Sequence, residues 1–498
     1  MEFDTGRPKV LVIGAGIGGI TTAALLARHG YEVTMAEKCQ RPGGRCGRMV
    51  VNGYHFDTGV TLFLMPELYA QTFTALGERM EDHLDLRRID PTYHLYFKDD
   101  SKLQLTSNLG AMQAQLEAIE PGSFGQFLSY IREGHRHYEL SLLHLVTRDF
   151  RSLPEFLNIK NLLLFLRLKL FTIHTSYVDR YFKDPRLKIA FTFQDLYMGL
   201  SPFEAPATYS LMQYTELADG VWFPMGGMYR VTEALTGIAE KLGVRFIFNA
   251  PVERILVDDR HATGIVLADG RDLRADVLVA NADLGYVYQH LLPEDGMTNS
   301  IDRKEYGCST VMFYWGLDKQ YPDLATHNLF LNGDYRQGFD AIFKNLTMPD
   351  EPNFYIHAPV RVDPSLAPIG HDTLAVAIPV GHINDENPQD WSVIKSRARK
   401  FVLQRLAQVG LSDIESHIKS EESGAPDDWQ NRYNLTRGST HGLSHKLTQM
   451  GYLRPHNRHH RYQNLYFVGA STHPGTGIPT VLVSARLVAE RVLQDRGN

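Results

Sequence analysis

Cysteine is scarce in this chain: only Cys39, Cys46 and Cys308 occur among its 498 residues. They form neither a C-x-x-C pair nor a metal-binding pattern, which argues against a disulfide framework and a cysteine-based metal site. We therefore expect no metal ion and a reducing compartment. Cys39 and Cys46 flank a glycine-rich segment, so two interpretations remain for them, buried reduced thiols or thiols beside a cofactor.

Positive charge and long apolar runs are lacking as well. The formal net charge of −6 at pH 7 argues against nucleic acid as a partner. No run approaches the ~20 apolar residues that cross a bilayer, and residues 1–10 contain no apolar core of a signal peptide. We expect no transmembrane helix, and a targeting peptide that is either absent or already removed. With 43% hydrophobic and 22% charged residues, the composition is that of a globular protein of two or three domains.

Glycine is concentrated near the N-terminus in a pattern that predicts a dinucleotide site. Lys9–Ile13 has the composition of a buried parallel strand, and Gly14, Gly16 and Gly19 follow it with the spacing G-x-G-x-x-G before a helix. Gly14 permits the tight turn, Gly16 lets the backbone approach a pyrophosphate, and Gly19 lets helix and strand pack closely. Glu37 ends the next strand about 20 residues on, where an acid accepts hydrogen bonds from a ribose. A glycine-rich turn without a ligand is the alternative.

The segment after the second strand indicates which dinucleotide binds. Residues 41–45 read RPGGR, an extension that nicotinamide dehydrogenases do not usually carry. Gly43 and Gly44 permit another close backbone approach, and Arg45 adds a fixed cation. The segment resembles the R-x-G-G-R of flavoproteins of the amine oxidase and carotenoid desaturase superfamily, where it lies along the FAD diphosphate. We therefore expect FAD.

The remaining pattern predicts an α/β protein with an α+β substrate region. A Rossmann-type FAD-binding domain is assembled from residues 1–65, 220–300 and 450–498, and residues 301–449 form a mixed-sheet substrate domain. Residues 66–219 read as a mostly helical, membrane-associating region with little strand character. Strands are predicted at 9–13, 31–36, 244–248, 252–257, 262–267, 276–281, 309–317, 354–358, 373–379 and 463–468, and helices at 231–242, 391–409 and 481–493.

Two segments keep two interpretations each. A hairpin over Met49–Phe56, with its turn at Asn52-Gly53, leads into Asp57, which either belongs to a D-x-G that returns the backbone to the flavin or simply forms a turn. Asn161–His174 is dense in leucine and phenylalanine but too short to span a membrane. It is either a buried helix or an interfacial segment whose cations lie at the lipid headgroups.

Over nearly its full length the chain resembles the bacterial and fungal type of phytoene desaturase, which are FAD-dependent carotenoid desaturases. The resemblance is carried by GAGIGG with Glu37 and by PGGR, and the last of its further blocks is the most specific. These blocks are GVWFPMGG at 220–227, NFYIHAP at 353–359, DPSLAP at 363–368, YLRPHN at 452–457 and NLYFVGASTHPGTGIP at 464–479. Thr476 and Thr480 stand where many members have smaller residues, so we expect a differently shaped pocket beside the flavin, which affects the choice of substrate and not the cofactor.

The resemblance implies a reaction on a polyene hydrocarbon such as phytoene, in carotenoid biosynthesis. A hydride leaves an allylic carbon for the flavin, a proton leaves the neighbouring carbon, and a quinone or oxygen reoxidises the flavin. Because the substrate is a membrane lipid, a peripheral position on the cytoplasmic side of a membrane is implied; oligomeric state stays open. The cofactor-binding residues implied are Gly14, Gly16, Gly19, Glu37, Lys38, Gly43, Gly44, Arg45, Asp57, Gly59, Val252, Gly469, Ala470, Gly477, Ile478 and Pro479.

Acid–base residues are less well defined. Asp149 and Arg151 lie near a charged pair considered for catalysis in the family; the aspartate matches, but the arginine is shifted by one residue. An ion pair that orders the helical region is the alternative. His473 lies in the flavin loop and either relays a proton or is a hydrogen-bonded structural residue. Other functions weighed are desaturation, oxidation or isomerisation of a 30-carbon diapocarotenoid or later carotenoid, amine oxidation, and a non-catalytic flavin-binding role.

Overall fold

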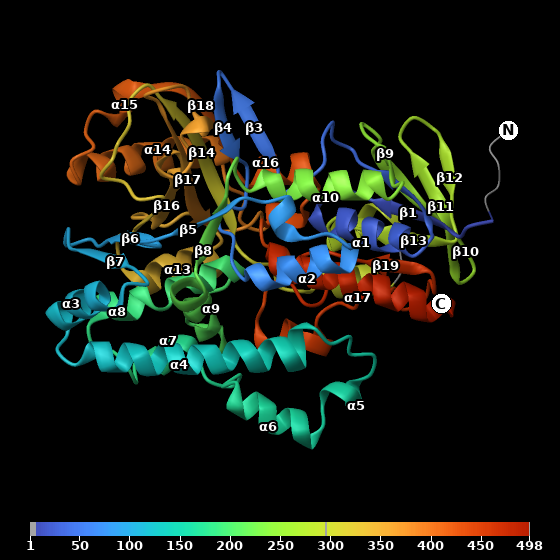
Figure 1. Ribbon diagram of the computed structural model, residues 1–498, viewed down its shortest axis with the longest axis horizontal. Helices are drawn as coiled ribbons and strands as arrows, with labels where there is room; N and C mark the ends of the chain where they lie inside the picture. Colours follow the sequence, from blue (N-terminus) through green and yellow to red (C-terminus); the bar gives the residue numbers. More distant parts are fainter. Residues whose placement is uncertain (1–5, 294–295, 498) are drawn as a thin grey trace.

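Five parallel strands form the sheet that carries the glycine-rich turn (Figure 1). The computed structural model describes residues 6–293 and 296–497. The strand order β19-β13-β1-β2-β9 joins distant parts of the chain, since Leu11 pairs with Leu278 on one side and Thr34 on the other. This confirms the predicted assembly from separated segments. The strands are β1 (Lys9–Ile13), β2 (Glu32–Ala36), β9 (Arg245–Ile247), β13 (Val277–Ala280) and β19 (Leu465–Phe467).

Each face of this sheet buries alternate residues of β1. Val10 and Val12 pack against the helices on one face, and Leu11 and Ile13 pack against a β-meander on the other. The helices are α1 (Ile17–Arg28), α2 (Pro66–Leu76), α10 (Tyr229–Lys241) and α17 (Ile478–Arg496). The meander is β10 (Val252–Asp258), β11 (His261–Leu267) and β12 (Asp272–Arg274), and α11 (Leu284–Tyr286) and α12 (Gly296–Asp302) follow it and β13 in the chain.

A second, seven-stranded sheet has the order β18-β14-β17-β16-β15-β6-β7. The sheet is mixed, as predicted: β15 and β6 pair in parallel, and all other neighbouring strands of this sheet pair antiparallel. Its strands are β6 (Tyr93–Tyr96), β7 (Lys102–Leu105), β14 (Ser309–Leu317), β15 (His327–Phe330), β16 (Phe354–His357), β17 (Asp372–Val380) and β18 (Ile418–Gly424). The helices of this part are α13 (Tyr335–Phe343), α14 (Trp391–Gln408), α15 (Ile414–His417) and α16 (Pro426–Tyr433).

Two short ribbons complete the strands. The predicted hairpin is β3 (Arg48–Val51) with β4 (Tyr54–Asp57), and its turn has positive φ at both Asn52 and Gly53. The other ribbon pairs β5 (Leu86–Ile89) with β8 (Val221–Pro224). Three strands, β5, β6 and β7, thus lie within 66–219, so the expectation of little strand character is wrong for residues 86–105. These strands have four residues each, and two of them pair with partners more than a hundred residues away, which local sequence does not reveal.

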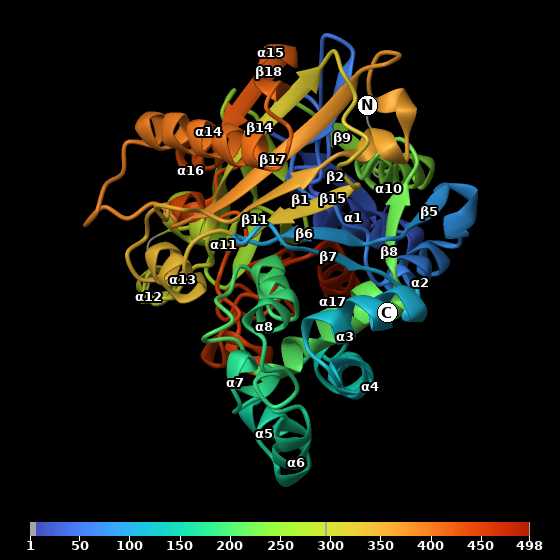
Figure 2. The same ribbon diagram turned by 90° about the vertical axis from the view of Figure 1, so that its left-hand side faces the viewer.

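Helices and their connecting loops make up the rest of residues 66–219. Two of these helices, α5 and α6, form a protruding tip (Figures 1 and 2). The apolar stretch Asn161–His174 does not form one helix, because the backbone turns at Lys169, where φ is 55°. Within the segment Leu164 and Phe165 are buried but Leu163 is 52% exposed, so a fully buried helix is excluded. The helices are α3 (Leu109–Ile119), α4 (Ser123–Ser141), α5 (Leu153–Phe156), α6 (Ile159–Arg167), α7 (His174–Val178), α8 (Pro185–Ala190) and α9 (Leu211–Tyr214).

Within the described residues, no helix combines the length and apolarity that crossing a membrane requires.

Candidate active site

A continuous cavity of about 930 Å³ reaches from the glycine-rich turn to the α5–α6 tip. Gly14 and Gly16 line it at one end, and Leu157, Leu162 and Phe171 line it at the other. Between them the walls consist mainly of leucine, methionine, phenylalanine and tyrosine side chains from both large parts of the molecule. The cavity therefore offers a polar end with backbone amides and a long apolar remainder.

The polar end is built by the turn between β1 and α1. Gly14 has a φ of 90°, and its N–H donates to the carbonyl of Ala36 at 2.8 Å. No side chain caps the N-terminus of α1, whose first residues Ile17 and Gly18 line the cavity, so its amides and dipole face the space where a diphosphate would lie. Gly19 lies behind the wall: a Cβ there would stand 2.3 Å from the carbonyl oxygen of Gly14. This glycine serves packing, as its position in the motif predicts.

The carboxylate of Glu37 lies at the same end and is nearly buried. It accepts hydrogen bonds from the backbone N–H of Ala15 at 2.6 Å and of Cys39 at 2.8 Å. Lys38, also in the wall, donates to Asn434 Oδ1 at 2.7 Å. The acid at the end of β2 therefore holds the phosphate turn and the following loop together, with its remaining lone pairs available to a ribose.

The second glycine segment follows as predicted. Gly43 donates to the Ala15 carbonyl at 2.7 Å, and Gly16 and Gly43 form an isolated parallel bridge. Gly43, Gly44 and Arg45 line the cavity, and Arg45 Nη1 donates to the Thr440 carbonyl at 2.8 Å. A cation is thereby fixed beside the two closely approaching backbones.

Asp57 does not line the cavity. Its carboxylate accepts from the backbone N–H of Met228 at 2.8 Å and of Tyr229 at 3.0 Å, which caps α10. Burial raises the pKa of this carboxyl to about 6. The backbone two residues on, at Gly59, lines the cavity, so the segment returns to the site while the aspartate itself serves the helix.

The C-terminal loop closes the site from the other side. The residues predicted there line the cavity, and no side chain caps the N-terminus of α17 at Gly477. A helix N-terminus in this position favours negative charge, which a flavin pyrimidine gains on reduction. The predicted residues are Gly469, Ala470, Gly477, Ile478 and Pro479, and Val252 lines the cavity from the meander.

These features fit FAD. Uncapped α1, the close glycines and Arg45 would hold the diphosphate, Glu37 the ribose, and the α17 N-terminus the isoalloxazine. Asn281 adds an unpartnered buried Oδ1 beside Gly16. When bound, FAD supplies the hydride acceptor, whereas the chain supplies position and charge.

Several residues of the site were not predicted. Arg454 is almost fully buried and donates to five backbone carbonyls at 2.6–3.1 Å, which fastens segment 443–449 to the flavin loop 469–472. His445 donates from Nδ1 to the Met198 carbonyl at 3.2 Å and accepts at Nε2 from the Thr476 N–H at 3.1 Å. Asn281 had a usable signal, as the first polar residue after a buried strand. Arg454 and His445 had none, because their partners are distant backbone groups.

The structure separates the three acid–base candidates. Asp149 and Arg151 contact each other at 3.3 Å, Asp149 also accepts from Arg491 of α17 at 3.1 Å, and neither residue lines the cavity. This placement fits an ion pair between the tip and α17 and does not fit contact with substrate. We therefore assign this pair to the contact between the tip and α17.

His473 does line the cavity and is nearly buried. Burial lowers its pKa to about 4, so the ring is neutral at neutral pH. A backbone hydrogen bond to Arg148 is the one polar contact that acts on the ring among the described residues, and it favours the charged form less than burial disfavours it. The structure therefore agrees with a structural role for His473 and leaves a proton relay as the alternative.

The three cysteines are free thiols that line the cavity, and Cys46 and Cys308 are buried whereas Cys39 is partly exposed. Cys46 therefore fits a buried reduced thiol, and Cys39 and Cys46 both lie at the predicted cofactor end. Burial raises the pKa of Cys46 and of Cys308 to about 12, which keeps both protonated. Across the part of the chain that the structure describes, no three histidine, cysteine or acidic residues are grouped to hold a metal ion.

Comparison with known proteins agrees with this geometry. The family described as flavin containing amine oxidoreductase matches residues 17–493. A "zeta-carotene-forming phytoene desaturase" of Myxococcus xanthus is 44% identical over 99% of this chain and 95% of its own length. A phytoene desaturase of Phycomyces blakesleeanus is 42% identical over 98% of this chain and 86% of its own length. A 4,4'-diapophytoene desaturase of Staphylococcus aureus is 33% identical over 98% of this chain and 99% of its own length.

Solved structures share the fold. An oxidoreductase of Methanosarcina mazei superimposes with a TM-score of 0.66 at 16% identity, covering 97% of this chain and 100% of that one. Putrescine oxidase superimposes with a TM-score of 0.62 at 13% identity, covering 98% and 99%. The chain is thus an FAD-dependent oxidoreductase that belongs to the flavin-containing amine oxidoreductase family, in the branch of the phytoene and diapophytoene desaturases.

Proposed function

We propose that this protein desaturates phytoene, with FAD accepting a hydride from one carbon while the neighbouring carbon loses a proton. The observation that supports this most is the cavity, whose apolar length begins at the flavin end and continues to the α5–α6 tip. A hydrocarbon offers no polar handle, so shape and apolar contact must position it. An amine substrate would instead require polar or negatively charged groups along the path to bind its ammonium group.

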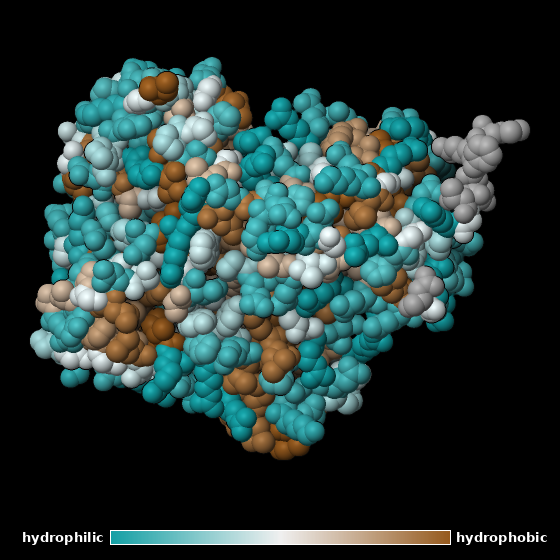
Figure 3. All heavy atoms as spheres, viewed as in Figure 1, coloured by the Kyte–Doolittle hydropathy of each residue, from teal (hydrophilic) through white to brown (hydrophobic). Residues whose placement is uncertain are grey.

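The tip supports access from a lipid surface. Figure 3 shows hydrophobic side chains gathered over α6. Leu163 is 52% and Phe171 59% exposed, and the exposed cations Lys160 and Arg167 flank this surface. Such a segment seats apolar side chains in the acyl region with its cations at headgroups. Because Leu157, Leu162 and Phe171 also line the cavity, a polyene dissolved in the membrane would enter directly.

We place the protein on the cytoplasmic face of a membrane, with a quinone or oxygen reoxidising the flavin. The 30-carbon diapophytoene is the competing substrate, because relatives that carry its name are also about one-third identical to this chain over almost their full length. Tunnel length decides between the two.

Expression in a carotenoid-free bacterium that makes phytoene tests the proposal. New coloured polyenes are expected, and the positions of their absorption bands count the conjugated double bonds. Phytoene left unchanged beside flavin-loaded protein contradicts the proposal, and the same strain design with diapophytoene then tests the alternative.

A further inference from the structure

A carboxyl group is buried behind the aromatic wall of the cavity without a cation. Glu216, in the π-helical turn Thr215–Asp219, is fully buried, and no described lysine, arginine or histidine forms an ion pair with it. The Tyr197 hydroxyl hydrogen-bonds to its Oε1, and Gln194 Nε2 donates to its Oε2 at 2.9 Å. Burying a lone carboxyl is costly, so its position beside the cavity calls for a function.

Two tyrosines connect Glu216 to the cavity. Tyr197 and Tyr93 both line the cavity, and their hydroxyl oxygens lie 2.6 Å apart. Each hydroxyl has one hydrogen, so the two hydrogen bonds that join Tyr93, Tyr197 and Glu216 can point in either of two directions. With Glu216 ionised, Tyr197 donates to Glu216 and Tyr93 donates to Tyr197; with Glu216 protonated, both donations reverse. A proton can therefore pass from the cavity wall to Glu216 by a shift of hydrogens along existing bonds.

The hydroxyl chain lies toward the flavin end of the cavity. The Tyr93 ring centroid is 6.2 Å from that of Tyr355, whose hydroxyl donates to Thr61 Oγ1 at 3.0 Å. Thr61 follows Gly59 by two residues, and Gly59, Thr61, Tyr93, Tyr197 and Tyr355 all line the cavity. A polyene carbon that reacts at the flavin would lie near these hydroxyls.

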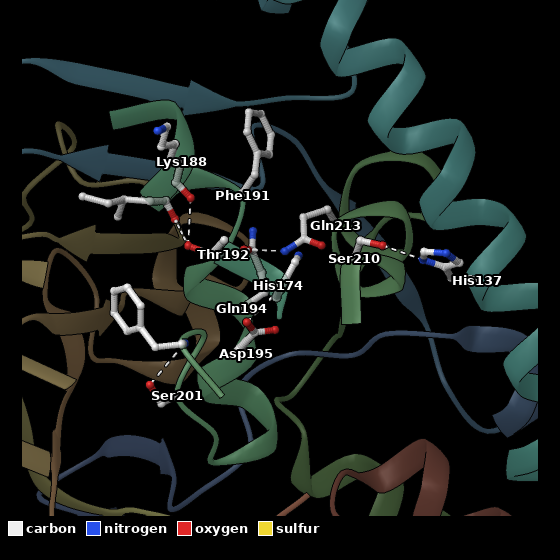
Figure 4. A network of polar contacts seen from close by, with 12 residues as sticks. His137, His174, Lys188, Phe191, Thr192, Gln194, Asp195, Ser201, Ser210 and Gln213 are labelled. Atoms are coloured by element: carbon white, nitrogen blue, oxygen red, sulfur yellow. Dashed lines mark hydrogen bonds and ion pairs between the residues drawn. The ribbon is translucent and has the colours of Figure 1, made fainter. Parts of the chain in front are cut away.

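A buried polar network fixes the group that faces Glu216. Gln213 Nε2 donates to Gln194 Oε1 at 2.9 Å, which leaves the Gln194 amide N–H pointing at Glu216. Behind it, His174 contacts Asp195 at 2.8 Å, and both lie beside Gln194 in Figure 4. The Tyr130 hydroxyl contacts the other ring nitrogen of His174 at 2.7 Å. The network anchors the 3₁₀ helix Phe193–Met198, which carries both Gln194 and Tyr197. Amides do not conduct protons readily, so this network orients Glu216 and does not carry a proton away from it.

We propose that Tyr197 takes the proton that the substrate loses and that its own proton passes to Glu216. The C–H bond breaks, its electron pair becomes the second bond of the new double bond, and the proton forms a new O–H bond on Tyr197. The hydride from the neighbouring carbon goes to FAD, so electrons balance; this step rests on the proposed desaturation. After product leaves, the proton returns through the same hydroxyls to water in the cavity.

The charge environment agrees with this role. Burial raises the pKa of Glu216 to about 7, near the pH at which a group both accepts and releases a proton. The ionisable groups that interact with it are Tyr197, Tyr93 and Tyr355, and burial raises the pKa of all three far above neutrality, so none of them changes charge in this range.

The test compares E216Q and Y197F with the exposed control E139Q. Purified holoenzyme is mixed without oxygen with phytoene, or the 30-carbon substrate that the wild type accepts, in lipid vesicles, and flavin bleaching is followed in a single turnover. We expect the wild-type rate to rise with pH through about 7, and E216Q and Y197F to be about 100-fold slower and independent of pH.

A purely structural Glu216 leaves the pH profile of a folded, flavin-loaded E216Q unchanged, and a rate within threefold of wild type overturns the proposal. If E216Q does not retain FAD, the rate and pH profile of Y197F carry the test.

Infrared difference spectra across pH give a reading without substrate. A carboxyl band that titrates near pH 7 in the wild type and is absent in E216Q is expected. Lack of such a band overturns the proposal, whereas failure of every polyene to bleach the wild-type flavin contradicts the desaturase function itself.

Discussion

Glu37 connects two backbone segments at the cofactor end of the cavity, because its two oxygens accept from Ala15 and Cys39. In Glu37→Gln the amide nitrogen would face one of these N–H groups, and the charge that attracts a ribose is lost. We expect FAD affinity to fall about tenfold, or ~1.4 kcal/mol, in titrations of the apoprotein. Glu240→Gln, on the exposed face of α10, is the matched control. Equal affinity in both variants would remove Glu37 from the cofactor site.

Single residues differ in how visible they are in the sequence. Gly14, Gly16 and Glu37 were predicted because one local motif fixes their spacing and their chemistry together. Arg454 and Glu216 were not, since their roles come from burial next to partners brought together by the fold. An arginine that donates to backbone carbonyls has no sequence signature, as any residue supplies a carbonyl.

At the scale of elements, the contact between the tip and α17 is the part of the structure in which Asp149 takes part. Asp149→Asn weakens partly exposed ion pairs to Arg151 and Arg491. We expect a loss of about 0.5–1 kcal/mol in unfolding free energy and unchanged turnover per bound flavin. Denaturant titration and a steady-state assay measure the two quantities. A large fall in turnover with full flavin content would return Asp149 to the mechanism.

The exposed face of α6 makes a second prediction at this scale. Replacing Leu163 and Leu166 by glutamate leaves the core intact, because both side chains are about half exposed. Two charges in place of two leucines that would insert into lipid should weaken vesicle binding by at least 100-fold in sedimentation with liposomes. Val393→Glu, an equally exposed site on α14, should bind as the wild type does. If the double variant binds equally well, α6 is not the lipid-contacting element.

Elements were predictable where their own residues carry the pattern. β14 matches its predicted bounds, and β1 was identified from a short run rich in valine and isoleucine. The strands β5–β7 were missed because distant partners stabilise them. Lys169 broke the predicted apolar segment by adopting a left-handed conformation that its sequence does not announce.

At the scale of the whole molecule, buried histidines set the acid stability. Burial lowers the pKa of His137, His441 and His473 to about 4 and of His357 to about 3. Between pH 6.5 and 4 the unfolded chain therefore binds more protons than the folded one, so stability falls as pH falls. Acids whose pKa burial raises oppose this in the same range, namely Asp57, Asp195, Glu216, Asp219 and Asp372. The histidines outnumber them, because burial also lowers the pKa of others, His327 and His445 among them.

We expect unfolding free energy to decrease from pH 7 to pH 5. His137 lies away from the cavity, so His137→Gln should make the slope shallower by roughly 1 kcal/mol per pH unit below pH 6 without affecting FAD binding. Urea titrations at each pH measure the slope. A slope that does not change on substitution would mean that His137 is protonated in the folded state.

The most direct test of the function is a single anaerobic mixing experiment. Flavin-loaded wild-type protein is mixed with phytoene vesicles, with diapophytoene vesicles, or with a polyamine, and the flavin absorbance is followed. Because the cavity joins the flavin end to an apolar tip, we predict that a polyene bleaches the flavin and yields a more conjugated product, while the polyamine does nothing. Bleaching by the polyamine alone would contradict the desaturase function and make the chain an amine oxidase.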